Sequence, residues 1–402
     1  MSRTPSQFGG FNVEAWLAVF GYGFRPFFLL AGLAALTLMA AWVAVGFGTA
    51  WSFDLSPAAW HGHEMLFGFV AAAVAGFLLT AVPSWTGSPA LSGAPLAALA
   101  ALWLAGRIAS LPQFAGSLPA ALVDLSFFPV LGAMLAAPLL RAGKLRNTVF
   151  LLLLLVLTSG NLLVRLEWLG MMTDTAGAGV ALTVGIVLLM VTVIGGRIVP
   201  AFTQNALRRI DPSFAIPPRP VLDRVTILLT LLLIPADLAM PETLALGALA
   251  AAAALIHAVR LAGWGGLRTL HDPLLWILHL GYGWIPVALA LKAAALLLGA
   301  PFGSGWLHAL TAGAFSTMIL AVMTRAALGH TGRELRAAPA TVLAYLLLAL
   351  AAALRAVAAV LPAAAYLPAL VLAGIAWAAA FALFLAVYLP ILTQPRPDGR
   401  PG

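Results

Sequence analysis

The chain contains seven histidines, and their ionisable side chains are unexpected in so apolar a sequence. Of the 402 residues, 63% are hydrophobic and only 8% are charged. Imidazole can ligate haem iron or copper, and an ionisable side chain inside an apolar helix is costly enough to mark a functional site by default. The seven are His61, His63, His257, His271, His279, His308 and His330. Of these, His257 and His271 are expected at the membrane interface, and the other five are candidate ligands.

The segment 60–64 (WHGHE) is the densest group of candidate ligands and opens an apolar run. Residues two apart on an α-helix point about 200° apart, so His61 and His63 cannot both face one interior site if both are helical. One would then be a ligand, and the other would face a loop or the headgroups. If His61 belongs to a non-helical cap, both can converge. Glu64 is the candidate to tune a ligand or carry a proton. Interfacial anchoring is the alternative interpretation of this motif.

His308 begins a second apolar run that, like the run after His63, is predicted to start at the outer face of the membrane. Two neutral imidazoles that face each other across a helix bundle can be the axial ligands of haem iron. We therefore predict His63 and His308 as axial haem ligands, with His61 as a further metal candidate. The alternative is a single histidine that is hydrogen-bonded near the interface.

Further candidates lie deeper in the membrane or toward its inner face. His279 lies inside an apolar run, where an ionisable residue is a functional candidate, and His330 follows at the inner end of another run. Both are candidate metal ligands. Arg325 and Arg333 flank His330 and are candidates to pair with haem propionates, because guanidinium binds carboxylates well. The alternatives are a histidine that donates to a backbone carbonyl and a solvated loop that sets topology.

Twelve apolar segments must position these side chains. Each can cross a hydrocarbon core of about 30 Å, which takes about 20 helical residues. They are 25–47, 61–82, 94–111, 118–140, 148–168, 177–200, 222–239, 242–262, 273–298, 306–328, 339–361 and 364–392. The sequence therefore predicts an all-α polytopic membrane helix bundle that forms one transmembrane domain over residues 1–402. The first apolar run has no signal-peptide cleavage site, so we expect it to be retained.

Positive charge orients the chain with both termini in the cytoplasm. With twelve helices and a cytoplasmic N-terminus, all but four of the 21 Lys and Arg residues fall on the inner side. The four are Arg107, Arg165, Lys292 and Arg355, at or inside outer helix ends. Arg107 is placed to pair with Asp124, whereas Lys292 and Arg355 can extend toward the interface.

Composition excludes several classes of function. The net charge of +8 is spread over short loops, so the chain is not a nucleic-acid-binding protein. Cysteine is absent, which excludes disulfides, thiolate metal sites and thioether-attached haem. Any haem or metal must be held by His, Met, Tyr or carboxylate ligands.

A short phrase recurs in the first and ninth segments. Residues 21–26 (GYGFRP) resemble residues 281–286 (GYGWIP), and each phrase is followed by a segment with Trp and His near its outer end. A weak internal repeat that relates segments one and two to nine and ten is therefore predicted, as is common in membrane folds.

Four motifs in order resemble the NnrS family. They are residues 23–29 (GFRPFFL), 60–68 (WHGHEMLFG), 76–87 (GFLLTAVPSWTG), and 322–325 (VMTR) with 329–333 (GHTGR). The resemblance covers nearly the whole chain. It implies a multi-pass protein of the bacterial inner membrane that contains haem and copper and acts in denitrification and the response to nitric oxide and nitrosative stress. It carries no ligand assignment onto individual residues.

Three functions follow as hypotheses. The first is a membrane protein with b-type haem and copper that binds or reduces nitric oxide, resembling a nitric oxide reductase if it turns over, with electrons from quinol or another membrane donor. The second is a transporter of a metal or a nitrosative-stress product, in which Asn161 and Arg165 are candidate residues. The third is a non-catalytic haem sensor that binds nitric oxide without turnover. In each case the lipid bilayer is the surrounding partner.

Overall fold

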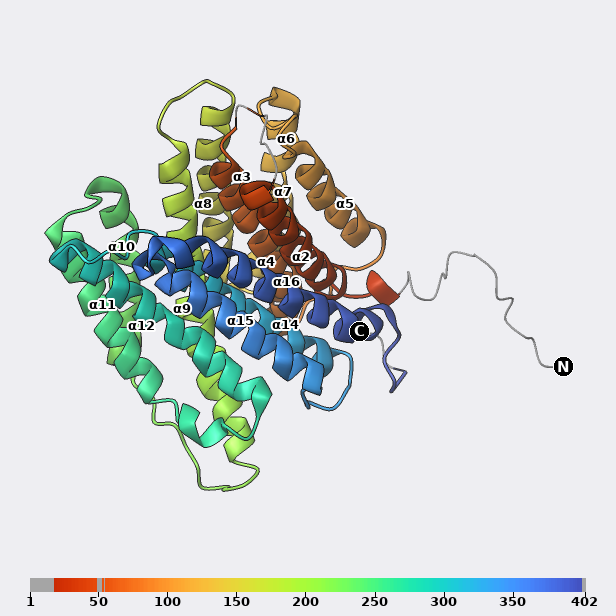
Figure 1. Ribbon diagram of the computed structural model, residues 1–402. Helices are drawn as coiled ribbons and strands as arrows, with labels where there is room; N and C mark the ends of the chain where they lie inside the picture. The colour runs from red at the N-terminus through yellow and green to blue at the C-terminus, as the bar shows by residue number, and fades with distance from the viewer. Residues whose placement is uncertain (1–17, 49–52, 54, 400–402) are drawn as a thin grey trace.

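The computed structural model describes residues 18–48, 53 and 55–399, and the regular structure of these residues is entirely helical (Figure 1). Each of the twelve predicted segments is a helix or a run of continuous helices. These are α2 (Phe24–Gly48), α3–η1–α4 (Pro57–His63, Glu64–Val70, Ala71–Thr86), α5 (Ala94–Ala109), α6 and α7 (Leu118–Leu125, Phe127–Arg141), α8 (Leu145–Trp168), α9 (Ala176–Leu207), α10 (Pro220–Ala239), α11 (Leu244–Ala262), α12 (Pro273–Leu298), α13–η3–α14 (Gly305–His308, Ala309–Phe315, Ser316–His330), α15 with η4 (Pro339–Val357, Ala358–Val360) and α16 (Ala363–Thr393). The 3-10 turn η2 (Gly266–Thr269) lies between α11 and α12.

Ten of these helical runs are long and apolar enough to cross a membrane, among the residues that the structure describes. The chain is therefore a polytopic helical membrane protein. The two runs outside this set are α5, with 16 residues, and α10, which carries Asp223, Arg224 and Asp237. The count of twelve crossings and the cytoplasmic termini remain predictions.

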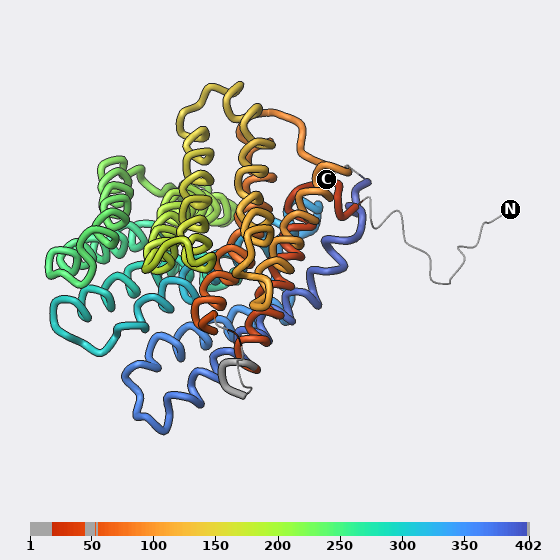
Figure 2. The backbone as a smooth tube through the Cα atoms, turned by 90° about the horizontal axis from the view of Figure 1, so that it is seen from above, coloured from red at the N-terminus to blue at the C-terminus, as the bar shows by residue number. Residues whose placement is uncertain are grey.

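Two helical runs form the centre of the bundle. We call 57–86 helix two and 305–330 helix ten. In their most apolar windows, 78% of the residues of helix two and 67% of those of helix ten are buried, against at most 50% in the other spans. The helices that carry the outer-face histidines are therefore surrounded by protein and little exposed to lipid. Figures 1 and 2 show α10, α11 and α12 grouped at one side of this centre.

Both central helices contain a seven-residue π-helix that begins directly after a histidine. In helix two, η1 follows His63, and in helix ten, η3 follows His308. π-Helical turns are rare and occur mostly at functional sites, because the extra residue in the turn redirects the side chains around it. The two histidine-bearing helices of the predicted repeat thus share a backbone feature. The repeat itself remains a prediction.

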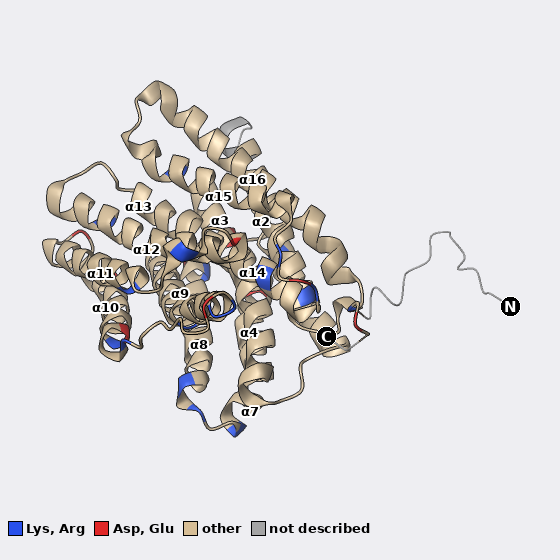
Figure 3. Cartoon of the chain, turned by 90° about the horizontal axis from the view of Figure 1, so that it is seen from below, with Lys and Arg blue, Asp and Glu red and all other residues tan. Residues whose placement is uncertain are grey.

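The two ends of the described chain meet at one side of the bundle, where α2 and α16 lie side by side (Figure 1). Arg25 is fully buried, and its Nη1 donates to the carbonyl oxygens of Leu392 at 2.9 Å and Gln394 at 2.8 Å. The arginine of the first motif therefore anchors the end of α16. Figure 3 shows that charged residues are sparse along the helices and that several basic ones lie between α7 and α8.

Candidate functional site

A cavity of ≈ 350 Å³ opens between helix two, helix ten, α2, α9, α15 and α16, beside His61 and His308. We call it the outer cavity, after the predicted orientation of the chain. Its walls are mainly apolar and aromatic, with a few polar side chains, which is the usual make-up of a cofactor site of about 300–1,000 Å³. The polar side chains on its wall are His61, His308, Thr311, Ser316 and Arg355.

His61 faces the outer cavity with its ring stacked on an indole. The ring centroids of His61 and Trp42 are 4.4 Å apart, with 25° between their planes. Its Nδ1 is buried and has no hydrogen-bond partner among the described residues. Buried polar atoms in proteins are almost always paired, so this imidazole nitrogen beside a cavity is a candidate to bind a ligand.

His308 is oriented by the turn that precedes it. Its Nδ1 lies 3.0 Å from the carbonyl oxygen of Ser304, to which it donates. A neutral imidazole that donates from one nitrogen has a lone pair on the other, and metal-bound histidines are commonly held by such a backbone contact. The arrangement therefore leaves Nε2 of His308 available as a ligand.

Arg355 supplies the cation at this cavity. Its Nη1 is buried without a hydrogen-bond partner among the described residues. Guanidinium is the side chain best suited to hold a carboxylate. Two histidines and an arginine with an unpaired nitrogen thus line one cavity, and these are the side-chain types that a haem with an anionic edge would require. The sequence had suggested instead that Arg355 extends toward the interface.

His63 does not line the outer cavity and is not brought to His308. It is fully buried, and both ring nitrogens face oxygen acceptors. Its Nδ1 lies 2.9 Å from Oε1 of Glu64, and its Nε2 lies 3.0 Å from Oδ1 of Asn161 and 3.2 Å from Oδ2 of Asp124. The expected divergence of His61 and His63 is therefore present, but His61 is the one that shares a cavity with His308.

Asp124 is the centre of a buried charge cluster, which consists of His63, Glu64, Arg107, Asp124, Asn161 and Arg165. The carboxylate of Asp124 accepts from Arg107, from Nε of Arg165 at 3.0 Å and from Nδ2 of Asn161 at 2.8 Å. The predicted Arg107–Asp124 pair is confirmed. Because Arg107 also donates to Glu64 at 2.6 Å, two arginines balance two carboxylates inside the bundle.

Close helix packing brings these charges together. A Cβ on Gly106 would lie 3.3 Å from Oδ1 of Asp124, and a Cβ on Gly68 would lie 3.3 Å from Cδ of Arg107. The indole of Trp103 donates to the carbonyl oxygen of Gly68 at 3.1 Å, inside the π-helix η1. The glycine that follows the WHGHE motif thus lets α5 approach helix two closely.

A second cavity, of ≈ 560 Å³, lies between α9 and the opposite ends of helix two and helix ten. We call it the inner cavity, after the predicted orientation of the chain. It brings together two of the predicted inner-face candidates, Arg325 and His330, and adds Arg197. The guanidinium of Arg325 lies 4.5 Å from the ring centroid of Phe202, and neither arginine has an ion-pair partner among the described residues. An anionic group would fit here as well.

Arg333, the other propionate candidate, does not line the inner cavity. It lies in the loop after α14, where partial burial lowers the pKa of its guanidinium below the ordinary value. Its Nη1 is buried without a partner among the described residues. Arg325 and Arg333 belong to one sequence motif, but only Arg325 lines the inner cavity.

His279 stands apart from both cavities. Its Nε2 lies 2.9 Å from the hydroxyl of Thr203, and its Nδ1 is buried without a partner among the described residues. No group of three or more His, Asp or Glu side chains in the described part of the chain is arranged to hold a metal ion. A metal at His279 or His330 would therefore need some of its ligands from groups other than His, Asp and Glu side chains.

His257, which the sequence predicts near the membrane interface, belongs to a buried hydrogen-bond network. This side chain is fully buried, with Nδ1 2.9 Å from the hydroxyl of Tyr282 and Nε2 3.0 Å from that of Thr230. Arg260 donates to the same tyrosine hydroxyl at 3.0 Å and to Asp223 at 2.8 Å. This network could not be predicted from the sequence, because it joins residues of three helices, α10, α11 and α12.

Two comparisons bear on identity. The family description "NnrS protein" matches residues 18–396, which is nearly the whole chain. A search of curated proteins returned no significant match.

Proposed function

Because the chain belongs to the NnrS family, a family of membrane proteins related to nitric oxide and nitrosative stress, we propose that it is a haem/copper protein that binds or reduces nitric oxide. The observation that carries this proposal is the outer cavity, which is lined by His61, His308 and Arg355 and where His61 and Arg355 each have a buried nitrogen without a hydrogen-bond partner among the described residues. The membrane is proposed to be the bacterial inner membrane.

The haem ligands in this proposal are His61 and His308. His63 is replaced in this role because both of its nitrogens already face oxygen acceptors. Arg355 would hold a propionate. Bound b-type haem would supply an iron that exchanges electrons and that could take up nitric oxide only in place of one of the two imidazoles. The protein's own contribution is to orient the two imidazoles, to exclude water and to neutralise the anionic edge.

In this proposal the buried charge cluster has a structural role, which is to hold the start of helix two in place. Glu64 and His63 directly follow the turn that presents His61, and Asp124 fixes that turn against α6 and α8. The cluster therefore holds the first turns of helix two, which carry His61, against α5, α6 and α8. Copper is proposed at the inner side, with His330 and His279 as candidate ligands. Quinol or another membrane donor would supply electrons.

The test is the cofactor content of protein purified after expression with ample haem and copper. We expect b-type haem by the pyridine haemochrome assay, copper by elemental analysis, and a change in the reduced spectrum when nitric oxide is added. Consumption of nitric oxide with a quinol donor distinguishes turnover from binding alone. Protein that contains no haem would contradict the proposal.

A transporter is the second candidate, and the observation that favours it is the pair of cavities toward opposite ends of the same helices. Such an arrangement suits alternating access around a central barrier. Uptake of a metal ion into proteoliposomes would support this function. Absence of uptake for every metal tested, together with bound haem, would favour the first proposal.

A further inference from the structure

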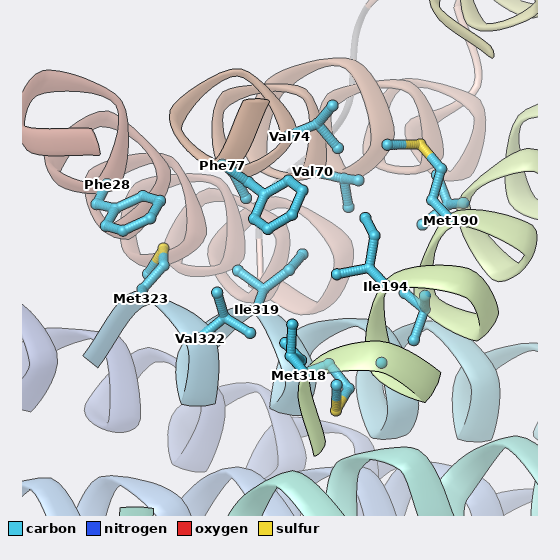
Figure 4. Close-up of a pocket in the computed structure, with 15 residues that line it drawn as sticks. Phe28, Val70, Val74, Phe77, Met190, Ile194, Met318, Ile319, Val322 and Met323 are labelled. Atoms are coloured by element: carbon cyan, nitrogen blue, oxygen red, sulfur yellow. The ribbon is translucent and has the colours of Figure 1, made fainter. Parts of the chain in front are cut away.

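A third cavity, of ≈ 80 Å³, shares lining residues with both the outer and the inner cavity, and several of its lining residues, such as Val74 and Ile319, are partly exposed, so it is open on one side. Figure 4 shows this cavity. We call it the middle cavity. Helix two, α9 and α14 form its walls, and Phe28 of α2 closes one corner. Figure 4 shows side chains such as Val74, Ile194 and Met318 directed into the space between these helices. All side chains that line it are apolar, and Gly195 adds only backbone.

The lining determines what can occupy the middle cavity. A buried water needs two to four polar partners, whereas an engineered apolar cavity of about 150 Å³ stays dry and binds benzene or xenon. The middle cavity is smaller, so its occupant must have only a few atoms. An ion would lose its hydration there without a compensating partner. These constraints select a small uncharged molecule.

The middle cavity adjoins both of the others. Val70 lines the middle and the outer cavities. At the other end, the middle and inner cavities share Phe28, Phe77, Ile194, Ile198 and Val322. Shared side chains therefore lie at both junctions, and side-chain rotations are fast on the time scale of ligand binding.

We propose that the three cavities form a passage that carries a small uncharged gas between the inner cavity and the histidines of the outer cavity. The gas is nitric oxide if the proposed function holds, and in this respect the inference rests on that function. Occupancy of the middle cavity by a gas does not depend on it. The apolar middle section lets a diatomic gas through and stops ions.

Xenon tests the site without any need for haem. Crystals of the purified protein are pressurised with xenon, and the anomalous signal locates the gas. We expect xenon in the middle cavity of the wild type. Val70→Phe, which fills the junction with the outer cavity, should reduce its occupancy, and Ile194→Ala, which enlarges the cavity, should increase it. Val149→Phe is the matched control, because Val149 is exposed on α8.

Flash photolysis of nitric oxide from the reduced protein tests the passage. In Val322→Phe we expect rebinding from solution to be about tenfold slower, as overpacking of a narrow junction would produce, with an unchanged final amplitude. Val149→Phe should rebind at the wild-type rate.

The outcomes separate the two proposals. A wild type without xenon in the middle cavity, or equal rebinding rates in Val322→Phe and Val149→Phe, would overturn the passage. Xenon in the middle cavity of a protein that lacks haem would support the gas site and contradict the proposed function.

Discussion

At the scale of single residues, two histidines of one motif face different environments. The α-helical geometry of 60–64 predicts that His61 and His63 diverge, and they do. Which of them faces the cavity could not be predicted from the motif, because Asp124 and Asn161 on α6 and α8 attract His63. Both Asp124 and Asn161 are distant from His63 in the sequence.

Asp124 should be the most sensitive residue of the buried charge cluster. Asp124→Asn removes the shared carboxylate and leaves two buried arginines short of a partner. Loss of one member of a buried ion pair costs about 3–5 kcal/mol, so we expect a markedly lower Tm in detergent. Asp398→Asn, at an ion pair near the surface, is the control and should melt like the wild type. Equal melting of both variants would show that the cluster does not stabilise the fold.

Arg355 should affect cofactor retention more than folding. Arg355→Gln removes the guanidinium that has an unpaired nitrogen at the outer cavity. Because a charge-assisted hydrogen bond is worth about 1.5–3 kcal/mol, haem should bind at least about tenfold more weakly to this variant. The measurement is haem transfer to apomyoglobin. Arg146→Gln, at an exposed position in the first turn of α8, is the matched control. Identical transfer from both variants would remove Arg355 from the site.

At the scale of elements, hydropathy was sufficient to locate the helices but not their irregular turns. All twelve predicted segments are helical, because apolar runs of this length have few alternatives in a membrane. The π-helices η1 and η3 leave no hydropathy signal, since an extra residue in a turn does not change composition. They are stabilised by neighbours such as Trp284, which packs against Gly313.

Gly313 tests whether the π-helix in helix ten positions His308. A Cβ at Gly313 would lie 2.6 Å from the ring of Trp284, so Gly313→Val must displace one of the two helices. Overpacking costs about 1–3 kcal/mol, and we expect a lower Tm and less bound haem.

The control for this prediction is Gly303→Val. A Cβ at Gly303 would meet no atom within 4 Å, so the variant should retain wild-type haem content. Normal haem content in Gly313→Val would show that packing of η3 on α12 does not determine the orientation of His308.

At the scale of the whole molecule, the three cavities connect the two ends of the bundle through helices two and ten. The sequence predicted that His308 and the WHGHE motif lie at one end and His330 at the other, and the outer and inner cavities have that arrangement. The cavities themselves could not be predicted, because each is lined by helices far apart in the chain.

Orientation can be measured directly because the chain has no cysteine. Single cysteines at Ser117 and Ser304 should react with an impermeant maleimide in intact spheroplasts, whereas Ser213→Cys should react only after lysis. All three positions are exposed. This pattern follows from the placement of positive charge on the inner side. Labelling of Ser213→Cys in intact spheroplasts would reverse the orientation or change the helix count.

Optical spectra of the oxidised and dithionite-reduced wild type, His61→Ala, His308→Ala and His63→Ala test the assignment of haem to the outer cavity most directly. We predict sharp reduced haem bands in the wild type, their loss in His61→Ala and His308→Ala, and their retention in folded His63→Ala. Bands that survive in His61→Ala but disappear in His63→Ala would contradict the assignment, and a wild type without haem bands would contradict the proposed function.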